Sequence, residues 1–104
     1  MPKAELAAAD QTFVDTTRGR KWGDRCYLHI KAQRYEWAVA ACQRGLSSNP
    51  NQWTHGALLY NLGLIGEKTG NIEAAKHYYS ESLRVRPSGR SADVVRRELQ
   101  RLSQ

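Results

Sequence analysis

The feature that most constrains this chain is a pattern that occurs twice, 37 residues apart. The first copy covers residues 35–50 and the second covers residues 72–87, and each copy ends with a proline. A pattern repeated at such an interval indicates two copies of one structural unit that packs against its neighbour. The matching pairs are Tyr35 and Ile72, Glu36 and Glu73, Ala38 and Ala75, Cys42 and Tyr79, Leu46 and Leu83, and Pro50 and Pro87.

The spacing of apolar residues in the second copy indicates a helix. Ile72, Ala75, Tyr79 and Leu83 follow one another at three or four residues, which places them on one helical face, and we expect this face to point inward. Gly70 and Asn71 come directly before them, and this pair can end one helix in a left-handed conformation and cap the next. Val, Ile, Thr and Phe form no alternating runs, so strands have little support. We therefore expect an all-α fold.

The second copy, together with the residues before it, resembles the tetratricopeptide repeat, a unit of two antiparallel helices. The resemblance implies an α-solenoid in which helix pairs stack on one another. One position departs from the family pattern, because Gly66 stands where the family has an aromatic residue. The residues that carry the resemblance are Leu59, Leu62, Gly63, Gly70, Asn71, Ala75, Tyr79 and Pro87.

The first unit, which consists of the first copy and the helical stretch before it, departs further from the family pattern. Trp22 matches the opening aromatic residue, but Arg25 and His29 stand where apolar or aromatic residues are usual. Cys26 replaces the usual small residue and Cys42 the usual large one. The resemblance is therefore good over residues 20 to 88 and poor at the ends of the chain.

The domain organisation follows from the interval. It exceeds the ~34 residues of the family period, so we expect residues 53–55 to lengthen the first helix of the second unit at its N-terminus. The units should cover about 19–52 and 53–89, followed by a capping helix over about 91–102 that Ser91 begins. Because a solenoid generally needs about three repeats, three alternatives stay open: flanking helices act as caps, the chain dimerises, or it comes from a longer array.

Residues 1–18 form either an N-terminal helix or a flexible tail. Leu6, Ala9, Phe13 and Val14 would share one face of such a helix. The next helical stretch covers about 22–33, and Asp24, which follows Gly23, is its expected N-cap.

Cys26 and Cys42 lie on the two antiparallel helices of the first unit, and both take inward positions of the repeat pattern. Two alternatives stay open. A disulfide would indicate an oxidising compartment, whereas two free thiols would pack as small hydrophobic groups. The localisation is open for the same reason: cytoplasmic, or exported with a signal already removed. No signal peptide is visible at Met1–Leu6.

The chain is basic, with 16 Lys and Arg against 10 Asp and Glu and a net charge of +6. This balance favours acidic partners. Arginines crowd the last quarter of the chain, which leaves RNA binding as an alternative function, but solvated helix faces explain them better than a nucleic-acid surface does. No run reaches the ~18 apolar residues that a membrane span requires.

The sequence offers no catalytic, metal or cofactor motif. His29, His55 and His77 lie far apart, and none forms a close Cys or His pair typical of zinc sites. A dyad of Cys26 or Cys42 with His29 would lack a group that orients the imidazole. We therefore predict a protein that is not an enzyme, with no cofactor and no metal.

The resemblance implies that the first helix of each pair lines a concave groove. Tyr and Arg are residue types that anchor interfaces, and the Lys and Arg residues here favour an acidic segment. We therefore predict binding of a peptide or protein segment; a self-associating scaffold, such as a homodimer, is a further alternative. The predicted groove residues are Tyr27, Lys31, Tyr60, Asn61, Leu64 and Lys68, with Arg96 and Arg97 from the last helix.

Two of these residues match the carboxylate clamp of chaperone-binding members of the family. Asn61 matches an Asn that holds the terminal carboxylate of a peptide, and Arg97 is a candidate for the Arg of the clamp. Gly23 and Tyr27 stand where the Lys and Asn of the clamp would be, so we do not expect a full clamp.

Overall fold

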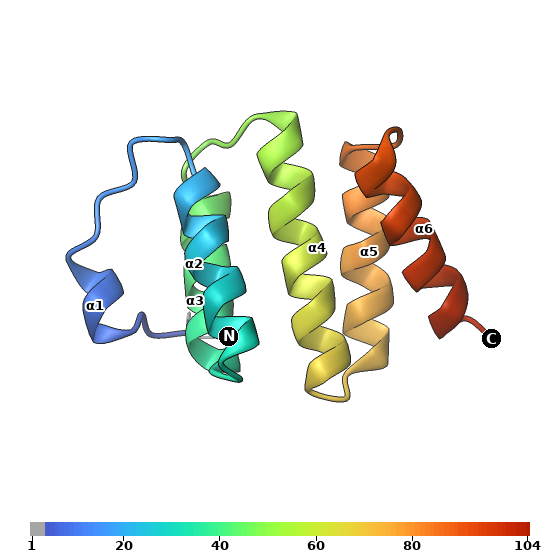
Figure 1. Cartoon of the computed structure of the whole chain (residues 1–104), viewed down its shortest axis with the longest axis horizontal. Helices are drawn as coiled ribbons and strands as arrows, with labels where there is room; N and C mark the ends of the chain where they lie inside the picture. Colours follow the sequence, from blue (N-terminus) through green and yellow to red (C-terminus); the bar gives the residue numbers. More distant parts are fainter. Residues whose placement is uncertain (1–3) are drawn as a thin grey trace.

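The computed structural model describes residues 4–104, which contain helices and, within that range, no strand. The all-α prediction is confirmed. The helices follow one another along the long axis of a molecule of 41 × 28 × 24 Å (Figure 1). In chain order they are α1 (Ala8–Gln11), α2 (Arg20–Lys31), α3 (Tyr35–Leu46), α4 (Gln52–Lys68), α5 (Ile72–Val85) and α6 (Arg90–Leu102).

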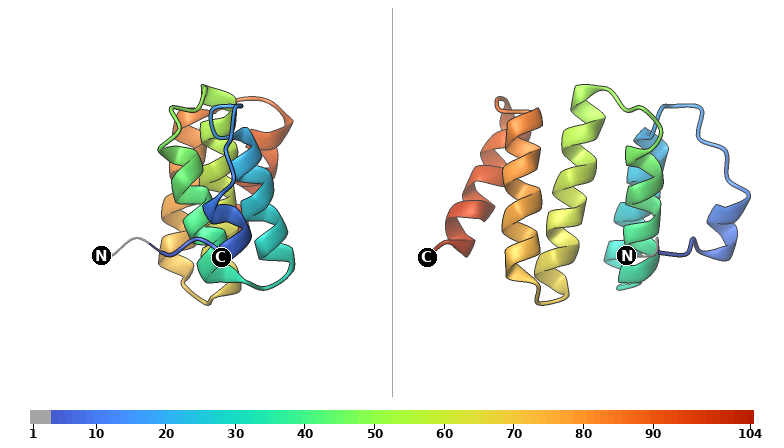
Figure 2. Two further views of the ribbon diagram at one scale, coloured as in Figure 1. Left: turned by 90° about the vertical axis from the view of Figure 1, so that its left-hand side faces the viewer. Right: turned by 180° about the vertical axis from the view of Figure 1, so that it is seen from behind.

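The helices pack mainly against their neighbours in the sequence. α2 packs on α3, α4 packs on α5, and α6 packs on α5, while α4 also contacts both α2 and α3. Seen end-on, α2 and α6 lie on one side of the molecule and α3 and α5 on the other (Figure 2). α4 therefore joins the first helix pair to the rest of the structure.

The interval of 37 residues reappears in the helix boundaries. α2 ends at Lys31 and α4 at Lys68, and α3 begins at Tyr35 and α5 at Ile72. α4 has 17 residues against 12 in α2, and the extra residues lie at its N-terminus, as the interval predicted.

The turns inside the two pairs also correspond. Gln33 (φ 61°) and Gly70 (φ 79°) occupy the same place, both in the left-handed region. Glycine takes this conformation without steric penalty, whereas another residue there costs ~1 kcal/mol or more. The side chain of Asn71 accepts a hydrogen bond from the N–H of Ala74 at 3.1 Å, so the predicted cap of α5 is confirmed.

The start of α2 differs from the prediction. Asp24 lies inside the helix, so the predicted N-cap is wrong. Asp15 caps it instead, because its Oδ2 accepts hydrogen bonds from the N–H groups of Gly19 and Trp22, both at 3.1 Å. Partial burial alone would raise the pKa of Asp15, but hydrogen bonds from Thr17, Trp22 and Gly19 outweigh it and hold the pKa below its usual value.

The start of α6 also differs. This helix begins at Arg90, and the N-cap position is Gly89. No side chain forms a capping hydrogen bond there, so the predicted cap Ser91 is wrong.

The N-terminal segment packs on the first helix pair with little helix of its own. α1 has four residues, and residues 1–3, on which part of the prediction for 1–18 falls, lie outside the described residues. Leu6 and Phe13 pack against the core, and the ring of Phe13 meets that of Trp22 edge-on at 5.0 Å between centroids. Ala9 and Val14 are exposed, so the predicted shared helical face is wrong.

The core consists of two clusters of buried residues. Of the predicted inner residues of α5, Ala75 and Tyr79 are fully buried, whereas Ile72 is 38% exposed and is therefore wrongly placed by the prediction. The second cluster contains Ala75, Tyr79 and Val95. The first cluster contains Trp22, Cys26, Ile30, Ala38, Ala41, Cys42, Leu58, Leu62 and Ile65.

Two glycines of α4 allow α5 to approach closely. A Cβ on Gly63 would lie 2.3 Å from Cε1 of Tyr79, so this glycine allows the two helices to pack closely. A Cβ on Gly66 would lie 2.8 Å from the backbone nitrogen of Ala75. The aromatic residue that the family pattern places at position 66 therefore has no room in this chain.

Gly63→Ala tests this packing. The new methyl group would force the Tyr79 ring to move, and overpacking of this kind costs about 1–3 kcal/mol. We expect the free energy of unfolding, measured by chemical denaturation, to fall by that amount.

Gly23→Ala in α2 is the matched control. A Cβ there would lie at ordinary contact distance, 3.4 Å from Cδ2 of Leu58. Because alanine also favours helix by about 0.8–1 kcal/mol over glycine, this variant should be at least as stable as the parent. Equal stability of Gly63→Ala and Gly23→Ala would contradict the packing described.

A chain of polar contacts ties α6 to the second helix pair. The hydroxyl of Tyr79 donates to Oε1 of Glu67 at 2.6 Å, and Arg101 donates to Oε2 of Glu67 at 2.5 Å. Burial alone would raise the pKa of Glu67, but the hydrogen bonds from Tyr79 and Arg101 hold it below the usual value. Burial, together with the hydrogen bond to Glu67, raises the pKa of Tyr79.

Glu67→Gln should therefore destabilise the protein in a pH-dependent way. A lowered pKa in the folded state adds stability above the unfolded-state pKa of 4.5, and this gain is lost as the pH falls through the folded-state value. We expect a loss of about 1 kcal/mol at neutral pH, typical of a hydrogen bond to a charged group that is partly screened. Urea denaturation at several pH values measures it.

Glu73→Gln is the control, since the Glu73 side chain is 90% exposed and lies 3.9 Å from Lys76. It should change the stability little at any pH. If the loss caused by Glu67→Gln were the same at acidic and neutral pH, the link through the ionised carboxylate would be wrong.

Candidate functional site

Three adjoining hollows lie along the face formed by α2, α4 and α6, and we call them together the α2–α4–α6 groove. Their volumes are about 300, 330 and 390 Å³. The first two share Trp53, Ala57 and Asn61 in their walls. Tyr27 and Tyr60 connect the third hollow to the second and the first. The groove therefore runs continuously from α6 across α4 to the end of α2.

The structure places six of the predicted site residues in this groove. Tyr27 is 46% exposed, and the ammonium of Lys31 lies 5.7 Å from its ring centroid. Burial raises the pKa of Tyr60, and the carboxylates of Glu98 and Glu67 raise it further. The six lining residues are Tyr27, Lys31, Tyr60, Asn61, Leu64 and Lys68.

Asn61 is not on an exposed flank, as the sequence had indicated. It is buried, with 9% of its surface exposed, and its amide nitrogen donates to the carbonyl oxygen of Gly23 at 3.3 Å. This bond joins α4 to α2 beneath the groove. The expectation of an exposed side chain is wrong, because the Asn61 side chain lies between the two helices and donates this hydrogen bond.

Arg96 and Arg97 lie outside the three hollows. The guanidinium of Arg96 donates to the carbonyl oxygen of Pro87 and pairs with Asp93 at 3.1 Å. Arg97 is exposed on α6. The structure therefore does not bring these two arginines together with the six groove residues.

Sequence reasoning missed several lining residues, among them Trp53, Ala57, Arg86 and Val94. A signal existed for two of them, because Trp53 and Ala57 continue the stripe of Tyr60 backwards at helical spacing. Trp53 is 58% exposed, the most exposed aromatic side chain of the groove. Arg86 follows α5, and nothing in its local sequence indicates that its side chain reaches the groove.

Three of the six arginines of the last quarter form ion pairs within the chain. Arg84 pairs with Glu81 at 2.7 Å, and Arg101 pairs with two carboxylates. Arg96 pairs with Asp93, and Arg86 is buried. Ion pairs within the chain thus engage half of the arginines that cluster in this part of the sequence.

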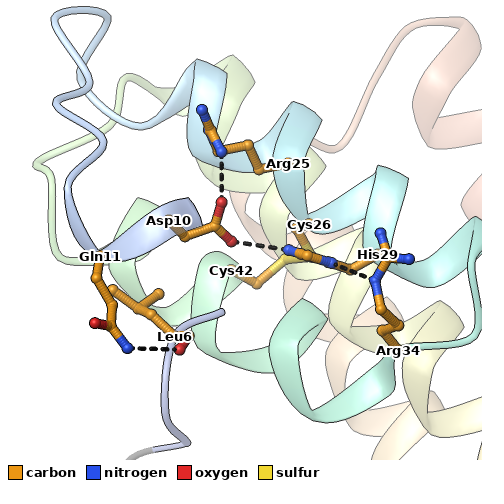
Figure 3. A network of polar contacts seen from close by, with 8 residues as sticks. All are labelled: Leu6, Asp10, Gln11, Arg25, Cys26, His29, Arg34 and Cys42. Atoms are coloured by element: carbon orange, nitrogen blue, oxygen red, sulfur yellow. Dashed lines mark hydrogen bonds and ion pairs between the residues drawn. A yellow bond between two sulfur atoms is a disulfide. The ribbon is translucent and has the colours of Figure 1, made fainter. Parts of the chain in front are cut away.

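A second polar site lies away from the groove, where the N-terminal segment meets α2 (Figure 3). Asp10 is 2% exposed, pairs with Arg25 at 2.5 Å and contacts Nε2 of His29 at 2.8 Å. Arg34 donates from Nε to Nδ1 of His29 at 3.2 Å. Because Nδ1 accepts this bond, the ring proton is assigned to Nε2, which donates to the Asp10 carboxylate.

This arrangement corrects one statement made from the sequence. Asp10 and Arg34 orient the imidazole of His29, which the sequence did not reveal. Both ring nitrogens are occupied by these partners, so neither is directed at a sulfur or a cleft. The contacts also explain why polar residues stand at positions 25 and 29, since both bind the carboxylate of Asp10.

Cys26 and Cys42 are joined by a disulfide in the structure, with their Cα atoms 5.4 Å apart (Figure 3). The bond links α2 to α3, and both residues are fully buried. Its formation in solution stays a prediction.

Alkylation tests this bond. The denatured protein, treated with iodoacetamide without reductant, should gain no adduct by mass spectrometry, because a disulfide leaves no thiol to react. After reduction it should gain one adduct at Cys26 and one at Cys42. Adducts formed without reductant would show free thiols and would remove the argument for an oxidising compartment.

Other kinds of site find no support in the described part of the chain. Residues 4–104 hold no group of three or more His, Cys, Asp or Glu side chains placed to share a metal ion. Over the same range, none of the helices combines the length and apolar character that crossing a membrane would require.

Antiparallel helix pairs that stack side by side, with a groove along their first helices, define a helical repeat protein. Residues 57–88, which form most of α4 and all of α5, match the model of the tetratricopeptide repeat. The tetratricopeptide repeat that the sequence pattern predicted is thus confirmed for this unit, which covers about a third of the chain. No curated protein and no solved structure matches the chain. The repeat is in general a protein–protein interaction module, which is the broad role that the match indicates.

Proposed function

We propose that this chain is a non-enzymatic interaction module that binds a peptide or protein segment in the α2–α4–α6 groove. The observation that carries the proposal is the pair of exposed aromatic side chains there, Tyr27 and Trp53, on walls that helix packing holds in place. Tyrosine and tryptophan are enriched among the residues that dominate binding energy at interfaces.

The groove is preorganised. Asn61 holds α4 to α2, and the disulfide between Cys26 and Cys42 holds α2 to α3. A partner segment therefore bears most of the entropic cost of ordering, and the groove itself loses little.

The charge of the groove favours a segment of acidic character. Lys31 and Lys68 line its far end, and the chain carries a net charge of +6. Arg20 and Asp24 both lie in the wall of the middle hollow, so opposite charges offset each other there. We therefore place the acidic residues of the partner towards the two ends of the groove.

We also propose that α2 and α3 form another repeat unit, which precedes the unit of α4 and α5, and that α6 is the capping helix. The shared interval of 37 residues supports the first assignment. For the second, α6 buries Ala92 and Val95 against the preceding pair and leaves Arg97 exposed to water.

The other functions have less support. RNA binding would need unpaired cations, whereas ion pairs engage Arg84, Arg96 and Arg101. Self-association in a homodimer would fill the groove with another copy of the chain. Light scattering tests it, and a monomer at high concentration would exclude this alternative.

Tyr27→Ala tests the groove. We expect it to weaken the retention of a partner in a pull-down at least about tenfold, as removal of an aromatic anchor does, while the melting temperature changes little. Leu28→Ala is the matched control, because Leu28 is the next residue of α2, is 61% exposed and lies outside the groove. It should leave the retention unchanged.

The pull-down is run with and without nuclease at moderate salt. A discrete protein retained in both conditions, and lost with Tyr27→Ala, supports the proposal. Material lost on nuclease treatment would favour RNA binding through the arginines, because phosphate contacts dominate the affinity for nucleic acid. Equal losses with Tyr27→Ala and Leu28→Ala would place the site outside the groove.

A further inference from the structure

Arg86 is a buried cation at the α6 end of the groove. It is 6% exposed, although arginine is seldom buried without a charged partner. Its terminal nitrogen donates to the carbonyl oxygen of Trp53 at 3.2 Å, and its guanidinium carbon lies 4.7 Å from the Trp53 ring centroid. Gly56 leaves the space for it, because a Cβ there would lie 3.0 Å from Nε of Arg86.

The charge of Arg86 is not balanced within the described chain. In residues 4–104 no carboxylate forms an ion pair with it, and its Nε has no hydrogen-bond partner. Burial lowers the pKa of Arg86, which shows that its surroundings disfavour the charge. A buried charge without a counter-charge costs stability, and an arginine remains charged at neutral pH.

The hollow above Arg86 has the character of a binding site for one negative charge. Seven residues line it, and Arg86 is the single charged one among them. Trp53 and Val94, exposed by 58% and 37%, give it apolar walls, and Tyr60 and Ser91 add hydroxyl groups. One guanidinium matches one carboxylate in charge and in the geometry of its donors, whereas a phosphate dianion would leave one charge unbalanced.

We infer that Arg86 receives an aspartate or glutamate side chain of the bound segment, with an adjacent apolar side chain of that segment resting on Trp53 and Val94. The inference rests on the proposed function and identifies the chemistry that one end of the groove recognises. A side chain suits the site better than a chain terminus, because the groove continues from this hollow into the next through Trp53, Ala57 and Asn61. A bound segment can therefore pass through rather than end there.

The test is a selection from short random peptides displayed with their C-termini fused to the carrier, so that no terminal carboxylate is free. A parallel library has free C-termini. The selected peptide is synthesised with blocked ends, together with a twin in which its acidic residue becomes the amide. Calorimetry then gives four dissociation constants, for the two peptides against the parent protein and Arg86→Met.

We expect the amide twin to bind the parent protein at least about tenfold more weakly than the acidic peptide, as the loss of a charge-assisted hydrogen bond implies. Against Arg86→Met the two peptides should bind alike. A purely structural role of Arg86 under Trp53 would instead weaken both peptides equally, which would overturn the inference. Arg86→Lys serves if Arg86→Met does not fold: it should bind the acidic peptide more weakly than the parent and still discriminate against the twin.

The remaining outcomes separate this inference from the proposed function. Peptides that need Tyr27 but show no acidic preference would overturn the inference and leave the groove proposal standing. Peptides that come only from the library with free C-termini, and that depend on Arg86, would show that Arg86 binds a terminal carboxylate. This result would also overturn the inference. A phosphorylated twin that binds more tightly than the acidic peptide would do the same. Peptides that bind Tyr27→Ala as tightly as the parent protein would overturn both the inference and the proposed function.

Discussion

The contact on which the fold depends most is that of the Tyr79 ring against the bare backbone of α4 at Gly63. Because no side chain intervenes, α5 lies close enough for the Tyr79 hydroxyl to reach the carboxylate of Glu67. Glu67 in turn binds Arg101 and so holds α6. On its other side the ring meets Tyr60 at 5.7 Å between centroids. One aromatic residue thus connects the second helix pair, the last helix and the wall of the groove.

The first pair is organised differently, around polar contacts and a covalent bond. Asp10 comes from outside the pair and binds Arg25 and His29, so the positions that depart from the family pattern form a coherent site. The disulfide replaces the large side chain that Tyr79 supplies in the second pair, since Cys42 stands at the corresponding position. The two halves therefore reach the same helix arrangement through different chemistry.

The sequence contained enough to predict the helices and the repeat, because apolar spacing and turn residues such as Gly70 and Asn71 are local signals. The groove residues of α4 could be predicted for the same reason, and Trp53 could have been added from the same stripe. Contacts between distant residues could not be predicted. Asp15 caps a helix that begins after it, Asp10 binds residues of a later helix, and Arg86 reaches the groove from the residue after α5. Each depends on the path of the chain in space, which periodicity does not specify.

The small second core cluster has a consequence for motion. α6 packs on α5, and the cluster that holds it contains few buried side chains. Segments with few buried contacts open at a lower free energy than the molecule as a whole. Ser91 and Val94 of this helix belong to the groove wall, so detachment of α6 and loss of the wall are one event. Occupation of the groove and protection of the α6 amides against hydrogen exchange are then thermodynamically linked, and each reports on the other.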